Sequence, residues 1–153
     1  YRREGDRLRL VREHHEVRGW PPGEPEKYGP ILLDCFDRGG SCYGVFDGGA
    51  LVGAAVLESR FIGRREDRLQ LKFLHVSRGH RGSGLGVRLF AKVVERAREL
   101  GARQLYVSST TSENTVRFYL NRGCRPAEEV DAALFALEPE DIHLELDLSQ
   151  GGA

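Results

Sequence analysis

Three glycines and two arginines are concentrated in the segment HRGSGLGVRLF, residues 80–90, where an apolar-periodic helix begins. Glycine weakens a helix start unless something must come close to the backbone there. Unpaired N–H groups and the positive end of the helix dipole favour an anion at this position. Gly82, Gly84 and Gly86 would let the backbone wrap a phosphate closely, so the spacing predicts a pyrophosphate site.

Side chains beside the glycines support an anion site. Arg81 and Arg88 can add positive charge, and Ser83 can add a hydroxyl. Glycines that only permit tight packing between a helix and a strand are the alternative, but packing explains one of the three and not all of them.

Two nucleotide-binding patterns fail at this turn. A Walker loop requires Lys and then Ser or Thr after its last glycine, whereas Val87 and Arg88 follow Gly86. The dinucleotide fingerprint requires a small residue where Leu89 stands. It also requires an acid near the end of the next strand, where this chain has Ser108-Ser109. An NTPase and a dinucleotide-binding protein are therefore disfavoured.

The elements around the turn are strongly patterned. Residues 69–77, LQLKFLHVS, predict a strand that runs directly into the turn. Apolar residues then recur at helical spacing from Leu85 to Leu100, and Gly101 is a good stop signal. The next strand is expected at residues 104–110. The turn is thus predicted to join the strand and the helix of a strand–helix–strand unit.

Hairpins and short elements surround this unit. Residues 1–17 predict a short hairpin, and residues 41–59 predict the clearest hairpin of the chain. Ser112 or Asn114 can cap a short helix, and residues 142–148 alternate as a strand with one wet face. We expect a mixed α/β sheet with helices packed on it, in which splayed strands can leave a crevice for a ligand.

The segment RGWPPGEPEKYGP, residues 18–30, holds four prolines and three glycines and is expected to lack regular structure. A linker is one interpretation. The alternative is a loop that borders a binding site, because it carries Trp20 and Tyr28. Pro30 is expected to open a short helix that stops at Gly39-Gly40.

Composition narrows the class of protein. The 153 residues indicate one domain, and the 23 basic and 23 acidic residues give no net charge that would attract nucleic acid or a membrane surface. We find no run as long as a membrane span and no signal peptide, so a cytoplasmic location is expected. Cys35, Cys42 and Cys124 lack metal-type spacing and are expected to be reduced thiols, and His14-His15 make a poor metal pair. No metal is expected.

Two motifs in the right order resemble the GNAT superfamily of acetyl-CoA-dependent N-acetyltransferases. The family's pyrophosphate loop, Gln/Arg-x-x-Gly-x-Gly/Ala, stands here at residues 81–86, RGSGLG, after a strand that ends at Val76. The segment SENTVRFYLNRGC is similar to a second family block, with Asn114, Tyr119 and Gly123 at the matching places.

The resemblance covers residues 30–148 and implies a fold of the α/β (α+β) class. That fold is a mixed, mostly antiparallel central sheet with a splayed central strand pair and flanking helices. It also implies a single acetyltransferase domain over residues 1–153, in which residues 1–29 form a variable N-terminal hairpin and Pro-rich loop.

Carried over residue by residue, the resemblance implies a binding path for acetyl-CoA, the cosubstrate. The backbone at His75-Val76 would pair with the pantetheine arm, which lies like an extra strand in the splay. The amides of residues 82–86 (Gly82, Ser83, Gly84, Leu85 and Gly86) would hold the pyrophosphate beside Arg81. Asn114 would bind the pantetheine arm, and Tyr119 would act near the sulfur as general acid.

These assignments suit direct acetyl transfer to a primary amine of a small molecule or peptide. The reaction needs a donor for the developing oxyanion, which the backbone N–H of Val76 can provide, and a proton for the departing thiolate, which Tyr119 can give. The general base is not in its familiar place, because Gln70 stands there. His75, Glu58 and Glu113 are candidate substitutes, directly or through water, and a water chain alone is equally open.

The sequence also allows a function other than catalysis. A module that binds an acyl-CoA and senses it without turnover would use the same turn. The acceptor pocket is expected at Trp20, Tyr28 and residues 127–141, whose acids would suit a cationic acceptor or simply form a solvated loop. An isologous homodimer is a further expectation, and Cys124 is expected to be a buried apolar filler and not a nucleophile.

Overall fold

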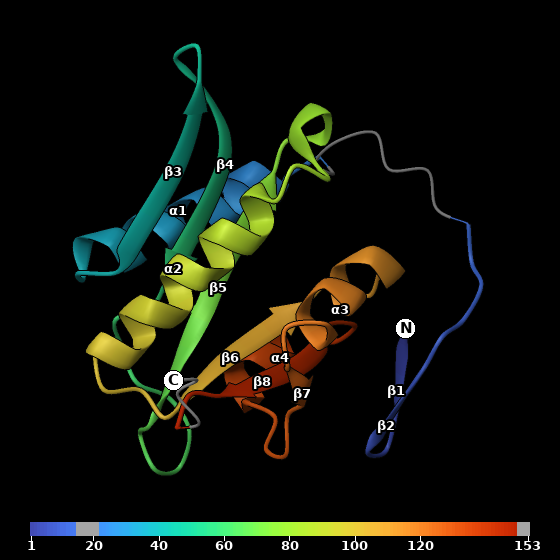
Figure 1. The fold of residues 1–153 in the computed structure, drawn as a ribbon. Coiled ribbons are helices and arrows are strands. Elements are labelled where there is room, and N and C mark those ends of the chain that lie inside the picture. Colours follow the sequence, from blue (N-terminus) through green and yellow to red (C-terminus); the bar gives the residue numbers. More distant parts are fainter. Residues whose placement is uncertain (15–21, 150–153) are drawn as a thin grey trace.

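The computed structural model describes residues 1–14 and 22–149, which form a mixed six-stranded sheet and a separate two-stranded hairpin (Figure 1). Only β5 and β6 are parallel neighbours, so the sheet is mostly antiparallel, as the resemblance implies. In spatial order the strands of the large sheet are β3 (Ser41–Asp47), β4 (Ala50–Leu57), β5 (Arg68–Val76), β6 (Gln104–Ser109), β8 (Ile142–Asp147) and β7 (Arg125–Pro126).

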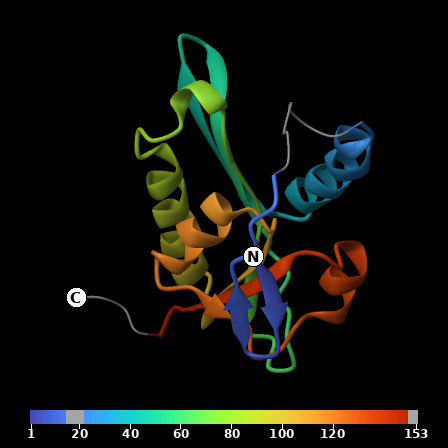
Figure 2. The ribbon, with the colours of Figure 1, turned by 90° about the vertical axis from the view of Figure 1, so that its right-hand side faces the viewer.

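Helices cover both faces of the sheet. In Figure 2, α2 and α3 lie on one side and α1 and α4 on the other. The buried core forms largely between the sheet and α2, whose buried residues are Leu89, Phe90, Val93 and Ala97. The helices span α1 (Glu24–Asp37), α2 (Leu85–Glu99), α3 (Glu113–Leu120) and α4 (Ala132–Leu137).

The two central strands separate along their length. β5 pairs with β6 only where residues 68–71 face residues 104–107, although β5 continues to Val76 and β6 to Ser109. Figure 1 shows the carboxyl ends of both strands pointing away from each other. This is the splayed strand pair that the resemblance implies. It leaves one edge of β5 without a partner strand just before the glycine turn.

The expectation of an irregular segment over residues 18–30 is wrong for its second half. α1 begins at Glu24 and contains Pro30 in its second turn. Pro25 stands in the first turn, where a missing N–H costs no hydrogen bond, and Gly23 ahead of it is left-handed with φ 86°. Gly23 and Pro25 are thus helix-start signals and not helix breakers, and Pro30 lies inside the helix that it is expected to open. Tyr28 therefore lies on a helix, and Trp20 lies outside the described residues.

Most other elements are confirmed. The N-terminal hairpin consists of β1 (Arg2–Glu4) and β2 (Arg7–Arg9), and α2 ends before Gly101 as expected. The acidic segment over residues 127–141 is not simply a loop, because it contains α4. Asp131 caps that helix by accepting hydrogen bonds from the amides of Ala133 and Leu134 at 3.0 Å each.

Candidate active site

Two of the three glycines in the turn are needed for their backbone conformation. Gly82 and Gly84 have φ values of 77° and 84°, a region that other residues enter only with strain. A Cβ built on either would meet no atom within 4 Å. The backbone is therefore bare and open to solvent where α2 begins, as an anion site requires.

Gly86 has a different role. A Cβ built on Gly86 would lie 3.2 Å from Cε2 of Phe118 and 3.8 Å from Cγ2 of Val76. This glycine lets α3 and the end of β5 pack closely against the first turn of α2. Tight packing thus explains one of the three glycines, as expected from the sequence.

The first amides of α2 are uncapped. Gly84 is the N-cap residue and no side chain accepts a hydrogen bond from the first turn. Within the described chain, the amides of residues 82–87 donate no backbone hydrogen bond outside the helix. Arg81 and Arg88 are exposed beside them, and the Ser83 hydroxyl donates to the carbonyl of His80. The turn combines unpaired N–H donors with positive charge.

The end of β5 offers a donor to the splay. The Ser77 amide donates to the Val52 carbonyl at 2.8 Å, which places Ser77 on the β4 side of the ladder. Successive residues of a strand direct their polar groups to opposite edges, so Val76 directs its N–H and C=O toward the splay. The carbonyl of Val76 accepts from Nε of Arg81 at 2.9 Å. By the same alternation, the N–H of Val76 points toward the splay.

His75 precedes this donor and occupies the opposite face of the sheet from Val76. The ring is half-buried. Burial, with a smaller contribution from Arg81, lowers its pKa below the ordinary 6.5. A neutral imidazole at neutral pH can accept a proton.

Tyr119 is buried in the aromatic packing between α2 and α3. Its ring lies 5.9 Å from that of Phe90 and 5.2 Å from that of Phe118, measured between centroids. Burial raises the pKa of Tyr119 well above its usual range, so the hydroxyl stays protonated. Among the described residues no hydrogen-bond partner holds this hydroxyl. Asn114 is exposed in the first turn of α3, and Ser112 is the cap of that helix.

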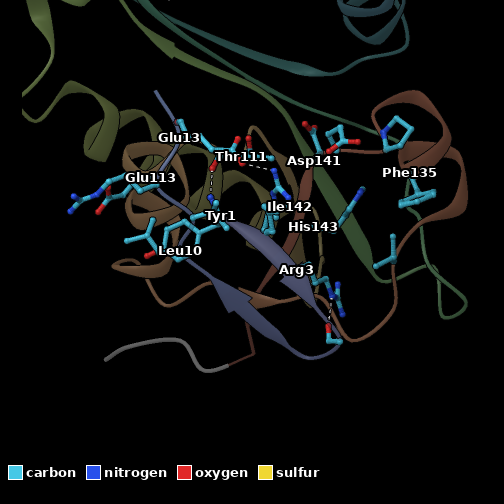
Figure 3. Close-up of a pocket in the computed structure, with 18 of the residues that line it drawn as sticks. Tyr1, Arg3, Leu10, Glu13, Thr111, Glu113, Phe135, Asp141, Ile142 and His143 are labelled. Carbon is cyan, nitrogen blue, oxygen red and sulfur yellow. Dashed lines mark hydrogen bonds and ion pairs between the residues drawn. The ribbon is translucent and has the colours of Figure 1, made fainter. Parts of the chain in front are cut away.

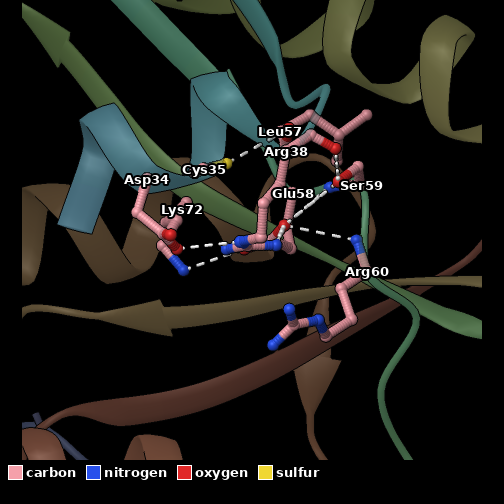
Figure 4. Close-up of polar contacts among 8 residues, drawn as sticks. All are labelled: Asp34, Cys35, Arg38, Leu57, Glu58, Ser59, Arg60 and Lys72. Atoms are coloured by element: carbon pink, nitrogen blue, oxygen red, sulfur yellow. Dashed lines mark hydrogen bonds and ion pairs between the residues drawn. The ribbon is translucent and has the colours of Figure 1, made fainter.

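The three candidate general bases lie in different environments. Glu58 is almost fully buried at the end of β4, where Arg38 Nη1 lies 2.7 Å from Oε1 and Lys72 Nζ lies 3.0 Å from Oε2 (Figure 4). The amides of Ser59 and Arg60 also donate to Oε1. Burial raises the pKa of Glu58, but these hydrogen bonds outweigh burial and hold it well below its usual range. Such a carboxylate is a poor base and joins α1 to the sheet.

Glu113 is exposed at the start of α3 and pairs with Arg117 at 3.1 Å. The cysteine expectation is confirmed in the described residues: Cys35, Cys42 and Cys124 are all free thiols. Burial raises the pKa of Cys124 to about 12, which suits a packed apolar residue and not a nucleophile.

A hollow of about 1270 Å³ lies on the other side of the splay (Figure 3), and residues of the segment 127–141, where an acceptor pocket is expected, line part of it. Sequence reasoning missed the N-terminal residues that line the rest. The N-terminal segment, the start of α3, α4 and the start of β8 line it, and Arg3, Asp141 and His143 are among its residues. Thr111 also lines it and follows directly from β6, so the hollow borders the β6 side of the splay. Alternation in IHLELDL predicts the strand, but nothing in the sequence brings residue 3 to residue 143.

No helix between residues 22 and 149 is long and apolar enough to cross a membrane. Within residues 1–14 and 22–149, no group of three or more His, Cys, Asp or Glu side chains is arranged to hold a metal ion.

The fold is similar to solved acetyltransferase structures. A GNAT-family acetyltransferase from Staphylococcus aureus Mu50 is 19% identical, with a TM-score of 0.68 over 84% of this chain and 81% of that one. A Bacillus subtilis acetyltransferase in complex with CoA is 23% identical, with a TM-score of 0.62 over 81% of this chain and 85% of that one. The PaiA N-acetyltransferase of Thermoplasma acidophilum, also in complex with CoA, is 20% identical, with a TM-score of 0.61 over 80% and 74%.

No curated protein matches the sequence at a significant level. The model of the acetyltransferase (GNAT) family, in contrast, matches residues 9–124, well over half of the chain. This span includes the glycine turn, the splayed strands and α3 with Tyr119. The chain therefore belongs to the GNAT acetyltransferase family.

Proposed function

We propose that this acyltransferase moves an acetyl group from acetyl-CoA directly to a primary amine of a small molecule or peptide. The observation that carries the proposal is the start of α2, where no side chain caps the helix and the glycines leave the backbone exposed, beside an open edge of β5. The amides of residues 82–86 would hold the CoA pyrophosphate, with Arg81 beside it. Neighbours of the same fold were solved with CoA bound, which supports this cosubstrate.

The open edge of β5 would bind the pantetheine arm as an added strand, with Asn114 near its outer part. The arm is extended and carries amide groups, so it can pair with the backbone at Val76, which directs its polar groups toward the splay, whereas His75 pairs with Ala54 of β4. This path would bring the thioester to the N–H of Val76. That N–H would then stabilise the oxyanion formed on the carbonyl oxygen.

In the chemical step the neutral amine attacks the thioester carbonyl carbon and a C–N bond forms. The tetrahedral intermediate collapses, the C–S bond breaks, and the thiolate takes the proton of the Tyr119 hydroxyl. The amine nitrogen gives up its extra proton to His75, directly or through water. His75 suits this role because burial lowers its pKa and keeps the ring neutral, whereas the ion pairs of Glu58 hold the pKa of that carboxyl well below its usual range. Tyr119 recovers a proton from solvent.

An acyl-CoA sensor without turnover is the alternative, and the Tyr119→Phe variant separates the two. The assay follows release of the CoA thiol from acetyl-CoA with a panel of primary amines. Tyr43→Phe, a change of the same chemistry on β3, is the matched control. An enzyme should lose about 100-fold in kcat in Tyr119→Phe and keep its affinity for acetyl-CoA. Binding of acetyl-CoA without amine-dependent release by the unmodified protein would support the sensor instead.

A further inference from the structure

Two buried N–H groups on residues that line the hollow beside the splay have no hydrogen-bond partner among residues 1–14 and 22–149. They are Nη1 of Arg3 and Nε2 of His143, and both residues line the hollow shown in Figure 3. His143 is only 3% exposed. A buried donor without an acceptor destabilises the folded protein, so two such donors on residues that line one hollow point to a ligand that accepts from them.

Hydrogen bonding determines which nitrogen of His143 carries the proton. The amide of Asp131 donates to the Tyr106 hydroxyl at 2.9 Å, so this hydroxyl directs its own hydrogen to Nδ1 of His143, 2.8 Å away. Nδ1 is therefore the acceptor, and Nε2 bears the hydrogen of the neutral ring. Burial, and then the charge of Arg3, lowers the pKa of His143 and keeps the ring neutral.

Arg3 is held in place by two backbone carbonyls. Its Nε donates to Gly5 at 2.8 Å and its Nη2 donates to Ala127 at 3.0 Å. Carbonyls do not neutralise the guanidinium, and no carboxylate within the described residues forms an ion pair with it. Arg3 thus brings a fixed positive charge and an unpaired N–H to the lining of the hollow, to which His143 contributes a neutral donor.

Two of the four carboxylates that line the hollow form ion pairs, and a third, Asp141, accepts from the Ser108 hydroxyl at 2.7 Å. Glu13 pairs with Arg2, and Glu113 pairs with Arg117. In the segment 127–141, Glu138 binds Lys27, Glu128 binds Arg125, and Asp131 caps α4. Several acids of this segment are therefore satisfied by the protein itself, whereas Glu140 lines the hollow without an ion pair to any described residue. A polycationic acceptor would bring positive charge to Arg3 and leave both donors unpaired.

We propose that this hollow binds a carboxylate of the acceptor, so that the acceptor is an amino acid or another amine that carries a carboxylate. One carboxylate oxygen would accept from Nη1 of Arg3 and the other from Nε2 of His143. Charge-assisted hydrogen bonds of this kind are short and strong. The inference rests on the proposed function, since the hollow borders the β6 side of the splay where the thioester would lie.

The experiment compares amino acids with their carboxamides, which keep the amine and lose the charge. The probes are glycine, leucine, phenylalanine and lysine, each beside its amide. Their binding to the free protein is followed through the His143 ring in ¹⁵N NMR, and their acetylation is followed by release of CoA thiol. We expect saturable binding and at least about a tenfold higher kcat/KM for one or more of the acids over its amide.

Arg3→Gln should abolish this preference, because glutamine carries no charge. Arg9→Gln is the matched control: Arg9 lies on the same hairpin, forms an exposed ion pair with Glu4, and does not line the hollow. If Arg3→Gln fails to fold, the comparison of each amino acid with its amide in the unmodified protein still tests whether the hollow binds a carboxylate.

The outcomes separate the two proposals. Equal acetylation of acids and amides would overturn the carboxylate site and leave amine acetylation standing. Arg3-dependent binding of amino acids without any transfer would support the site and overturn the proposed function. Absence of binding by all four amino acids at millimolar concentration would overturn the carboxylate site.

Discussion

Gly86 and Phe118 join the two sequence motifs of this acetyltransferase. The position of a Cβ on Gly86 lies 3.2 Å from Cε2 of Phe118, so the first turn of α2 rests directly on α3. Phe118 in turn packs edge-on against Tyr119. The turn that would hold the pyrophosphate and the helix that carries the proposed acid therefore form one packed unit.

Gly86→Ala should test this packing. The added methyl group requires Phe118 to move by a few tenths of an ångström, which should cost about 1 kcal/mol of stability. Because Tyr119 moves with its neighbour, we expect kcat to fall more than the affinity for acetyl-CoA. Gly79→Ala is the control, since a Cβ at Gly79 meets nothing within 4 Å. Equal kinetics in both variants would contradict the coupling.

Glu58→Gln should destabilise the protein and leave catalysis intact. Removing the buried carboxylate leaves Arg38 and Lys72 without their partner, and loss of one member of a buried pair costs about 3 kcal/mol. The free energy of unfolding from urea titration measures this loss. The kcat at a temperature where the variant is folded should match the unmodified protein. A fall of 100-fold or more, as expected for loss of a general base, would instead make Glu58 catalytic.

The loss of stability caused by Glu58→Gln should depend on pH. The pKa of Glu58 is lower in the folded protein than its ordinary 4.5, so its contribution to stability is present above that value. The contribution disappears as the pH falls toward the pKa of the folded state. The stability difference between the protein and Glu58→Gln should therefore shrink below pH 4.5. A difference that stays constant down to acid unfolding would be inconsistent with the ion pairs of Figure 4.

Arg3→Gln should raise the pKa of His143. Burial and then the charge of Arg3 lower this pKa below 6.5, whereas Asp131 raises it. Removal of the Arg3 charge leaves burial opposed by Asp131, so the pKa moves upward while remaining below the ordinary value. NMR titration of the ring measures the shift, with Arg9→Gln as the reference. An unchanged pKa would contradict the influence of the Arg3 charge on His143.

The glycine turn and the helix that follows it could be predicted because their signals are local. Residues 81–86 carry the turn conformation in their own glycines, and the stripe from Leu85 to Leu100 specifies the helix that follows. The start of α1 could not be placed correctly, because Gly23 and Pro25 are typical both of an irregular loop and of the residues that begin a helix. Which of the two forms depends on how the whole helix packs against the sheet.

The hollow and the ion pairs could not be predicted because they join distant parts of the chain. Arg3 and His143 are 140 positions apart by number, and each looks like an ordinary strand residue in its own segment. Glu58 was a reasonable base candidate until the structure placed Arg38 and Lys72 against it. Buried polar partners follow from the tertiary fold, which short-range patterns do not encode.

The most direct test of this account is calorimetric titration of acetyl-CoA into the Gly84→Ala and Gly101→Ala variants. Both glycines are left-handed, with φ values of 84° and 87°, and neither Cβ would meet an atom within 4 Å. The two substitutions should therefore strain the fold equally, by about 1–2 kcal/mol. We predict that Gly84→Ala weakens acetyl-CoA binding at least about tenfold, because it disturbs amides that would hold the pyrophosphate, while Gly101→Ala binds like the unmodified protein. Equal affinities in all three proteins would contradict the claim that this turn binds acetyl-CoA.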